Sequence, residues 1–415
     1  MKLSRVERHI IVKSEILEEL THKSKNLYNY ANYLIRQYFF ETGKLLKEFE
    51  LTTQLAKDNQ IDYRDMPTAQ SAQQTIKLLF KNWKSFFKAI KDYKKNPSKY
   101  KGRPKLPKYK DKKGHNIVVF TNQNCKIKTD EKGENYVYFP KKTGLEPIKT
   151  KIEGNLKQVR IIPQATCFIV EIVYEKEFQK VVEENNRVLS IDLGLNNLVT
   201  TFNNIGEKPF IVRGKIIKSI NQYYNKKKAK LMSYIGDKGT SNQIKKLTLK
   251  RNNKINDYLH KTSKIIIDYC LLNDISKIVI GNNKDWKQNI NIGKKNNQNF
   301  VSIPFEKLIT QIEYKAEEVG IEVLTTEESY TSKIDHLAKE ELKKQENYLG
   351  KRVKRGLFKS STGRFINADV NGAIGIFRKV VPDLFNQWLD TVGNRGFASN
   401  PVVIKLDYKG NFNNV

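Results

Sequence analysis

Two short segments, residues 189–194 (LSIDLG) and 367–373 (NADVNGA), each hold a single acidic residue among apolar or small neighbours. Asp192 lies in the first, which has the composition of a buried strand, and Asp369 lies in the second. An ionised carboxyl group buried in such a strand costs several kcal/mol unless a partner satisfies it. A divalent cation bound by several carboxylates is such a partner. The pair therefore predicts metal-dependent chemistry and a fold that brings these two distant segments together.

The second half of the chain alternates predicted strands with predicted helices. Three consecutive strands are expected within residues 188–212, with turns near 194–196 and 203–206. Helices are expected at 215–233 and 242–272, then a strand at 277–280, a helix at 304–319, a strand at 321–326 and a last helix from Asp369. Strands separated by helices imply a partly parallel sheet that helices cover. We therefore predict an α/β fold with Asp192 on its first strand.

The first half is predicted to combine a helical block with a β-rich region. A strand is expected at 6–12, helical residues at 14–50, and a second helix at 68–94 that starts behind Thr68 and buries its aromatic side chains. Residues 96–113 form a connector rich in lysine and proline. Strands follow at 116–120, 136–139, 158–162 and 166–175, the last two as a hairpin. We expect a small barrel or open sheet that includes the opening strand, with the helical block inserted between its strands.

The charge balance limits the partners of the chain. Its 415 residues include 76 basic and 44 acidic side chains, which gives a formal net charge of +32 and an isoelectric point near 9.7. This excess is typical of a nucleic-acid binder, although a codon bias towards lysine and asparagine would also raise it without explaining the shortage of acids. Three scattered cysteines support neither a disulfide framework nor a Cys-x-x-Cys zinc site. No apolar run reaches the roughly 18 residues of a membrane span, so we expect a cytoplasmic, nucleoid-associated protein without a membrane partner.

Several blocks of the sequence together resemble one family. They are LSIDLGLNNLVTTF, KIVIGNNKDWKQNINIGKKNNQNFVSIPF, EVLTTEESYTSK and NADVNGAIGIFRKV in the second half, with PTAQSAQQTIKLLFKNW and YKGRPKLPKYK in the first. In this order they resemble the TnpB family of insertion-sequence proteins, which is related to the type V CRISPR effectors. The resemblance implies a multidomain α/β protein with a RuvC-like (ribonuclease H-like) nuclease domain and a β-barrel wedge domain that carries an inserted helical recognition domain.

On that resemblance the chain divides into six segments. Residues 1–12 supply a wedge strand, 13–95 the recognition domain, 96–185 the rest of the wedge, 186–330 the first part of the nuclease domain, 331–366 a basic lid, and 367–415 the final helix and tail of the nuclease domain. The implied activity is RNA-guided cutting of double-stranded target DNA beside a short flanking motif. The implied partner is a guide RNA from the transposon right end, with a monomer expected on each RNA. The implied cofactor is Mg²⁺ or Mn²⁺, because two such ions about 4 Å apart hydrolyse phosphodiesters in RuvC-like sites.

Asp192 and Asp369 match the first and last catalytic acids of the family, although a helix N-cap is the alternative for Asp369. The middle acid departs from the family, because its usual place after the fourth strand holds Gly281. The next strand ends in Glu327 and Glu328, and neighbouring parallel strands lie only about 4.8 Å apart. We predict that Glu328 is the displaced third metal ligand. Glu327 is the alternative, because adjacent strand residues face opposite sides and only one of the two can serve.

Residues 332–365 also depart from the family, which commonly carries a four-cysteine zinc ribbon there. The segment has no cysteine and one histidine, His336, so no structural zinc is expected and His336 is predicted to be an ordinary surface residue. Its basic residues favour a lid that contacts nucleic-acid phosphates, with a solvated basic surface as the alternative. The residues assigned to this lid are Lys351, Arg352, Lys354 and Arg355.

Other nucleic-acid contacts are predicted in the first half. Gln and Asn side chains pair with adenine edges, and by the resemblance the flanking motif is read by Gln70, Gln74, Lys77, Thr121 and Asn122. Tyr100 and Tyr109 in the connector are expected to hold RNA by stacking. Because the middle acid is missing from its usual place, a nuclease-dead RNA-guided DNA-binding repressor is a rival interpretation. A conventional transposase, or a transposase-associated accessory protein, is a third.

Overall fold

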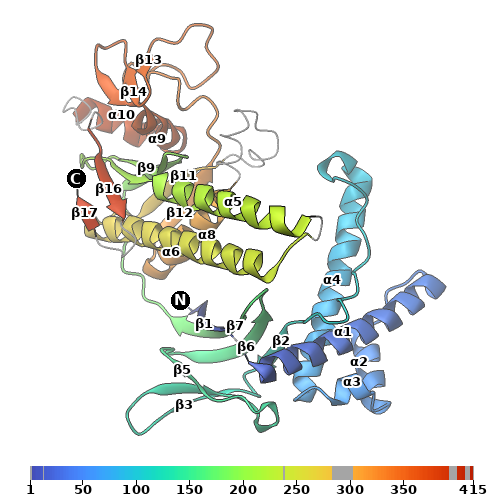
Figure 1. Ribbon diagram of the computed structural model, residues 1–415. Helices are drawn as coiled ribbons and strands as arrows, with labels where there is room; N and C mark the ends of the chain where they lie inside the picture. The colour runs from blue at the N-terminus through green and yellow to red at the C-terminus, as the bar shows by residue number, and fades with distance from the viewer. Residues whose placement is uncertain are drawn as a thin grey trace. The chain divides into compact units, whose positions relative to one another are not determined.

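The computed structural model describes residues 2–12, 14–236, 239–282, 302–391 and 400–406, and the backbone of 412–414. It contains two compact units, Lys2–Glu177 and Phe178–Val415, which are described separately below. Both units mix helices with strands, so the predicted α/β class is confirmed (Figure 1). Residues 283–301, part of the second family-like block, lie outside the described residues. None of the described helices is both long enough and apolar enough to cross a membrane.

The first unit contains an antiparallel sheet in the order β1-β7-β6-β2 and a smaller sheet in the order β3-β4-β5. The strand β1 pairs along its whole length with β7, so the opening strand joins the later strands as predicted. The hairpin between β6 and β7 is also confirmed. The strands are β1 (Lys2–Ile11), β2 (Val118–Thr121), β3 (Lys126–Thr129), β4 (Asn135–Tyr138), β5 (Ile148–Thr150), β6 (Asn155–Pro163) and β7 (Phe168–Glu177), and a 3-10 turn, η2 (Lys141–Thr143), precedes β5.

The helical block lies between β1 and β2 in the chain. It consists of α1 (Glu15–Thr42), α2 (Glu48–Lys57), α3 (Ile61–Arg64) and α4 (Ala69–Lys95), followed by the 3-10 turn η1 (Pro97–Lys99). The prediction of helical residues throughout 14–50 is wrong, because Gly43 ends α1 in the left-handed conformation with φ 69° and its N–H donates to Phe39 O. Thr68 caps α4 as predicted, and the Trp83 side chain is fully buried.

The second unit is built on a seven-stranded sheet in the order β12-β11-β8-β9-β10-β16-β17. Its strands are β8 (Val188–Leu193), β9 (Asn197–Asn203), β10 (Phe210–Arg213), β11 (Lys277–Gly281), β12 (Glu322–Thr326), β16 (Val402–Leu406) and β17 (Phe412–Asn414). Strands β8, β11 and β12 run parallel to one another, while β9 runs antiparallel to β8. The carboxyl ends of the three parallel strands therefore meet at one edge of the sheet.

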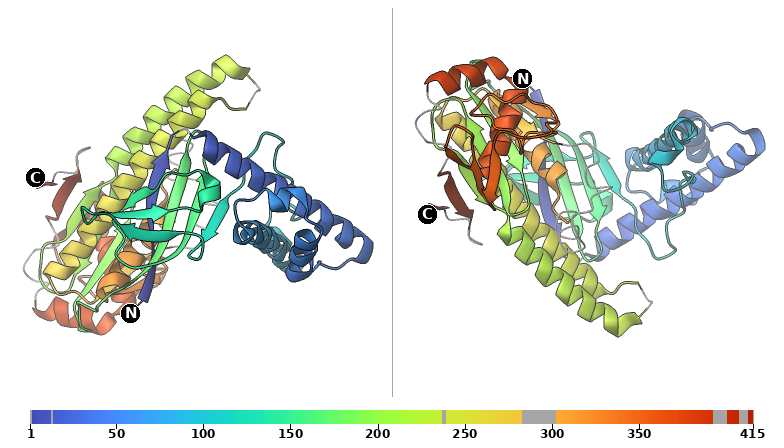
Figure 2. Two further views of the ribbon diagram at one scale, coloured as in Figure 1. Left: turned by 90° about the horizontal axis from the view of Figure 1, so that it is seen from below. Right: turned by 90° about the horizontal axis from the view of Figure 1, so that it is seen from above.

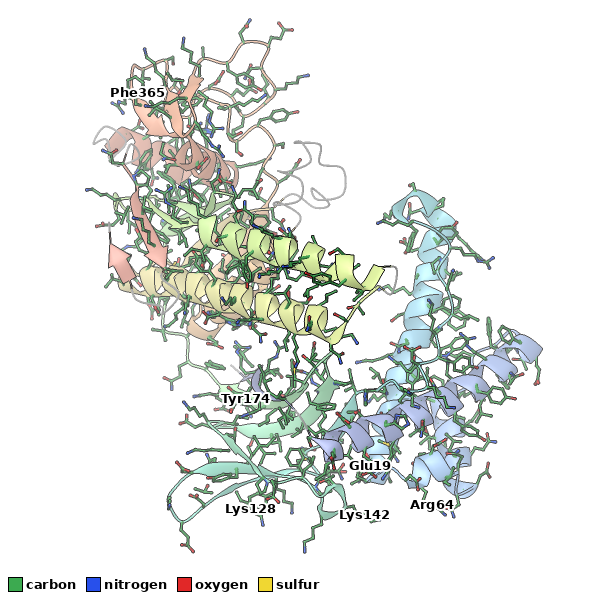
Figure 3. All side chains as sticks on the ribbon, in the orientation of Figure 1. Glu19, Arg64, Lys128, Lys142, Tyr174 and Phe365 are labelled. Carbon is green, nitrogen blue, oxygen red and sulfur yellow. The ribbon has the colours of Figure 1, made fainter. Side chains whose placement is uncertain are left out.

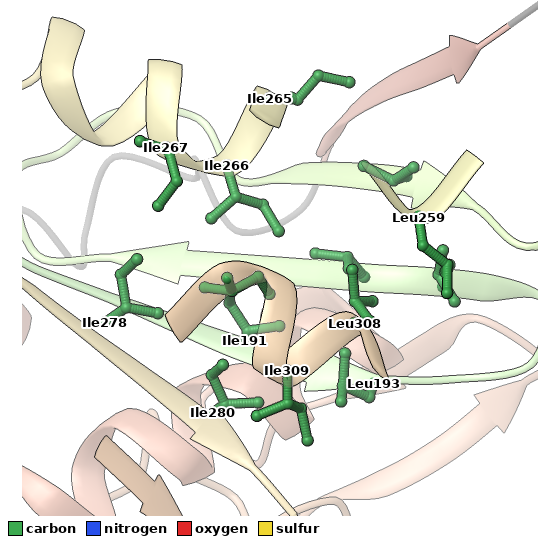
Figure 4. Packing of buried hydrophobic residues seen from close by; sticks show 14 of the residues in the cluster. Ile191, Leu193, Leu259, Ile265, Ile266, Ile267, Ile278, Ile280, Leu308 and Ile309 are labelled. Atoms are coloured by element: carbon green, nitrogen blue, oxygen red, sulfur yellow. The ribbon is translucent and has the colours of Figure 1, made fainter. Parts of the chain in front are cut away.

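Helices cover both faces of this sheet. One apolar cluster joins the sheet to α5 (Lys215–Ile235), α6 (Asn242–Leu272) and α8 (Phe305–Val319), and a second joins it to α9 (Ala368–Val380) and α10 (Pro382–Thr391). Figure 2 shows α5 and α6 running side by side. In Figure 4, Ile191 and Leu193 of β8 pack near Leu308 of α8. Because strand residues alternate between faces, Asp192 points to the opposite face, which α9 covers.

Between β12 and α9 the chain forms a small antiparallel sheet of β13 (Lys351–Lys354), β14 (Leu357–Lys359) and β15 (Phe365–Asn367). The exposed side chain of Phe365 at the start of β15 is labelled in Figure 3. Asp335 is fully buried beneath this segment and accepts hydrogen bonds from the Ser361 backbone N–H and the Ser360 hydroxyl, each at 2.7 Å. A hydrogen-bonded carboxylate therefore ties the beginning of the segment to its end.

Candidate functional site

Asp192 lies one residue before the end of β8, on the sheet face that α9 covers. The register of β8 and β11 pairs Ile191 with Ile280, so the next position on β11, Gly281, faces the same side as Asp192. Asp192 comes close to α9 as well. A Cβ atom added to Gly372 would lie 2.7 Å from Asp192 Oδ2. The glycine at position 372 of α9 therefore leaves room for this carboxyl group.

Glu328 lies two residues beyond the end of β12 and faces the same site. The last pair of the β11–β12 ladder is Gly281 with Thr326, and alternation from Thr326 puts Glu328 on the Asp192 face and Glu327 on the other. The Glu327 side chain is exposed, whereas Glu328 is half-buried. A Cβ atom on Gly281 would lie only 2.5 Å from Glu328 Oε1. The Glu328 carboxyl group therefore fills the space that a side chain at position 281 would need.

Asp369 enters the site from the first turn of α9. The N-cap interpretation of this residue is wrong, because the cap is Asn367, whose side-chain oxygen accepts from the N–H groups of Asp369 at 3.0 Å and Val370 at 3.3 Å. The Asp369 carboxyl is instead free of a capping role. Its Oδ2 accepts a hydrogen bond of 2.6 Å from Asn197 Nδ2 on β9, and its Oδ1 lies 3.3 Å from the Arg352 guanidinium.

The three carboxyl groups interact electrostatically. Burial raises the pKa of Asp192 well above its ordinary value, the negative charges of Glu328 and Asp369 raise it further, and Arg352 opposes the rise. Burial also raises the pKa of Glu328 to about 7. Since the charges of both other acids act on Asp192, the structure brings the three predicted carboxylates near one another at this end of the sheet.

A cleft of about 610 Å³ opens in front of this cluster. Asp192 and Asp369 line it, while Glu328 does not and lies on the Gly281 side of Asp192. The other lining residues come from the ends of β8, β9 and β10 and from the β13–β14 hairpin, and they are Leu193, Gly194, Asn196, Asn197, Thr200, Arg213, Lys215, Arg352, Arg355, Gly356 and Asn367. The cleft thus has an acidic floor and a wall of arginine and lysine side chains, a combination that suits a metal ion and a phosphate together.

The donor atoms of the site suit a hard divalent cation, which prefers oxygen ligands. Besides the carboxylates, the side-chain oxygen of Asn197, which lines the cleft, is buried and has no hydrogen-bond partner within the described part of the chain. In the ranges that the structure describes, however, no three His, Cys, Asp or Glu side chains already stand close enough to share one ion. The acids are therefore arranged as a cluster that a bound cation would have to tighten.

His336 is not the surface residue that the sequence predicts, because its side chain is fully buried. Its Nε2 donates a hydrogen bond of 2.8 Å to Thr331 O, and Gly375 of α9 packs against this ring, since a Cβ atom there would lie 2.7 Å from Nε2. Burial lowers the pKa of His336 to about 4, so the ring is neutral at pH 7. The residue joins the end of β12 to α9.

The predicted nucleic-acid contacts are all accessible, but they occupy different places. Gln70 accepts a hydrogen bond of 3.2 Å from Asn124, just beyond Thr121 at the end of β2, so the α4 glutamine and this strand end lie together. Tyr109 is 45% exposed and stacks under Arg36 at 4.7 Å, whereas the Tyr100 hydroxyl donates to Asp92. The remaining predicted contacts, Gln74, Lys77, Asn122, Lys351 and Lys354, are half-buried or exposed.

Sequence reasoning missed three residues of the site. Asn197 holds Asp369, Gly372 admits Asp192, and Lys379 of α9 donates to Glu327 O at 3.0 Å and to Ser329 Oγ at 3.1 Å. Asn197 follows the Asp192 motif by a short turn, so its position on an antiparallel neighbour of β8 could have been noticed. Nothing in the sequence pattern distinguishes Lys379 from the many other lysines of the chain.

Comparisons with known proteins agree with this architecture. Residues 171–287 match the probable transposase family OrfB_IS605, and residues 305–376 match the Cas12f1-like TNB domain. A TnpB-like protein of Methanocaldococcus jannaschii is 28% identical over 44% of this chain and 66% of its own length, so the chain matches just under two thirds of that relative. A TnpB-like protein of Acidianus two-tailed virus is 22% identical over 89% of this chain and 84% of its own length.

The fold is similar to that of Cas12f1 in its complex with sgRNA and target DNA. The TM-score is 0.59 at 15% sequence identity, over 88% of this chain and 82% of that one. The family matches cover both halves of the acidic site, because Asp192 lies in the first and Glu328 and Asp369 lie in the second. These matches confirm the predicted resemblance, because they show that the chain is similar to TnpB-like proteins and to a solved type V CRISPR effector.

Proposed function

We propose that this chain is a transposon-encoded, metal-dependent, RNA-guided DNA endonuclease with a RuvC-like nuclease domain. The observation that carries the proposal is the cluster of Asp192, Glu328 and Asp369 at one edge of the sheet. The similarity of the chain to TnpB-like proteins and the likeness of its fold to Cas12f1 support it. The net charge of +32 fits a protein that holds a guide RNA and a target DNA at once.

Asp192, Glu328 and Asp369 would hold the Mg²⁺ or Mn²⁺ ions, because the charges of Glu328 and Asp369 both act on Asp192 and all three groups offer the oxygen ligands that these ions prefer. When bound, such ions supply an activated water and a counter-charge for the leaving oxygen of a phosphodiester. The protein contributes the geometry. Asn197 donates a hydrogen bond to one oxygen of Asp369. The other oxygen faces the guanidinium of Arg352, whose exposed side chain is free to turn away and uncover that oxygen.

Arg352 and Arg355 would bind phosphate groups of the DNA substrate. Both line the cleft in front of the acids, and guanidinium groups bind phosphate oxygens through paired hydrogen bonds. A phosphate that enters the cleft competes with Asp369 for Arg352, so the DNA strand would release the carboxylate as it binds. This role matches the lid assigned to residues 331–366, and it needs no zinc because the Asp335 hydrogen bonds hold the segment.

The test is cleavage of a matched target by protein co-purified with the RNA of its own element end, with Mg²⁺ present. Asp192→Ala should lower the cutting rate more than about a hundredfold and still bind the target, because loss of metal-borne charge stabilisation costs several kcal/mol. Glu328→Ala should lower it at least about tenfold. Glu327→Ala is the matched control, since its exposed side chain faces away, and it should cut like the wild type.

Other results would reject the proposed nuclease site or favour a different function. Undiminished cutting by Asp192→Ala rejects this nuclease site altogether, and equal rates for Glu327→Ala and Glu328→Ala reject the displaced acid. A wild-type protein that binds its target tightly but leaves it intact in both Mg²⁺ and Mn²⁺ favours the second candidate, an RNA-guided DNA-binding repressor. The observation that favours the repressor is Gly281, because it leaves the usual position of the family's middle acid without a carboxylate.

A further inference from the structure

One face of α9 contacts the surroundings of all three carboxylates. Asp369, Gly372, Gly375 and Lys379 follow one another at spacings of three, three and four residues, which places them on a single stripe of an α-helix. Asp369 supplies its own carboxyl group. Gly372 lies against Asp192, because a Cβ atom there would come within 2.7 Å of Oδ2. The remaining two positions, Gly375 and Lys379, lie against the turn that carries Glu328.

The turn that carries Glu328 lies beyond the last pair of the β11–β12 ladder. The β11–β12 ladder ends at Thr326, and one further hydrogen bond of 2.8 Å runs from Asn282 N–H to Thr326 O. Glu328 lies two residues beyond the end of β12, which is the outermost strand of the sheet within the described residues, so among these residues no strand pairing fixes its backbone. A metal ligand in this place depends on contacts from outside the ladder, because a productive site must be held to within about 0.5 Å.

α9 provides those contacts on both sides of Glu328. Lys379 Nζ donates to Glu327 O at 3.0 Å and to Ser329 Oγ at 3.1 Å. The Glu328 carbonyl oxygen accepts from Thr331 Oγ1 at 2.9 Å, and Gly375 lets α9 approach Thr331, since a Cβ atom there would lie 2.7 Å from Thr331 Cβ. The residues before and after Glu328 are therefore bound to the helix that also carries Asp369.

We propose that Lys379 is a positioning residue that sets the Glu328 carboxylate against Asp192 by clamping the 327–329 turn to α9. The inference rests on the proposed function, in which Glu328 binds metal. Lys379 itself donates to a backbone carbonyl and a serine hydroxyl and takes no part in the chemistry. The helix α9 then fixes the separation of Asp369 and Glu328, which the sequence places on different elements. The Lys379 contacts hold the Glu328 turn in place of the strand pairing that ends at Thr326.

The test uses Lys379→Met, which keeps the aliphatic stem and removes the donors, and Lys379→Arg, which keeps a positively charged group with N–H donors. Lys264→Met is the matched control, because Lys264 is an exposed lysine of the same unit that pairs with Asp268. Two quantities are measured on the metal-free protein without nucleic acid: deuterium exchange of the 327–331 amides, and Mn²⁺ affinity from the free-ion signal in electron paramagnetic resonance. Lys379→Met should speed the exchange and weaken Mn²⁺ binding about tenfold. Lys379→Arg should restore both, and Lys264→Met should change neither.

A double-mutant comparison separates the two levels of the inference. In a Glu328→Ala background, Lys379→Met should cause no further loss of Mn²⁺ affinity, because the clamp acts only through that carboxylate. Unchanged exchange at 327–331 in Lys379→Met overturns the clamp, whether or not the protein binds Mn²⁺. Wild-type Mn²⁺ affinity in Glu328→Ala would instead overturn the metal site of the proposed function, so the two failures are distinguishable.

Discussion

At the scale of single residues, the metal-free site holds protons that the unfolded chain would release. Burial raises the pKa of Glu328 from 4.5 to about 7, and burial with the charges of Glu328 and Asp369 raises that of Asp192. Both groups therefore bind protons more tightly in the folded state, and the folded protein loses stability as the pH rises from the unfolded pKa through the folded one. At about 1.4 kcal/mol for each pKa unit, Glu328 alone accounts for a loss of at most roughly 3.5 kcal/mol.

The prediction is that, in a chelator, the wild type loses more unfolding free energy between pH 5 and pH 7.5 than Glu328→Gln does. The difference between the two proteins is the measured quantity, because a chain of charge +32 also changes stability with pH through general repulsion. Denaturant unfolding at the two pH values provides it. Adding Mg²⁺ at pH 7.5 should raise the stability of the wild type more than that of the variant. If the unfolding free energies of the two proteins change equally with pH, the proton on Glu328 does not contribute to the pH dependence of stability.

At the scale of the elements, the glycines of α9 record how closely the helix approaches the site. Gly375→Ala would place a Cβ atom 2.7 Å from His336 Nε2 and from Thr331 O. Alanine favours a helix over glycine by about 1 kcal/mol, so helix propensity alone predicts stabilisation. Overpacking costs about 1–3 kcal/mol, and we expect it to win, so that Gly375→Ala lowers both the free energy of unfolding and the cutting rate. Gly102→Ala, where no atom lies within 4 Å of the added Cβ, is the control, and a stabilised Gly375→Ala would contradict the close contact.

The elements that the sequence predicts correctly are those with local signals. Alternation along one strand predicts that only one of Glu327 and Glu328 can face Asp192, and in the structure Glu328 is the one whose carboxyl lies against Gly281. The length of α1 was wrong because the break depends on the single left-handed Gly43. The burial of His336 and the contacts of Asn197 and Lys379 escaped prediction for a different reason. Each depends on a partner that another element of the fold supplies, as in Lys379 with Glu327, and periodicity carries no information about such partners.

At the scale of the whole molecule, the excess of basic residues predicts strongly salt-dependent binding. A protein that neutralises several phosphates loses affinity along a line of log affinity against log salt, with a slope of roughly −0.9 for each phosphate contact on duplex DNA. Only lysines and arginines that touch phosphates contribute to the slope. Lys351 and Lys354 on β13 are exposed beside the cleft-lining Arg352 and Arg355, whereas Lys261 and Lys264 on α6 already pair with Asp257 and Asp268.

Substituting each of these two lysine pairs therefore distinguishes a lid that contacts phosphates from a solvated basic surface. We expect the double variant Lys351→Gln, Lys354→Gln to reduce the magnitude of the slope for target DNA by about 1 to 2, because a lysine that no longer neutralises a phosphate releases about one counterion fewer. The double variant Lys261→Gln, Lys264→Gln removes the same formal charge and should leave the slope nearly unchanged. Binding is measured with the guide RNA in place, on the Asp192→Ala protein in chelator, so that no strand is cut. Equal slopes for the two double variants would mean that only net charge matters and that β13 does not touch the DNA backbone.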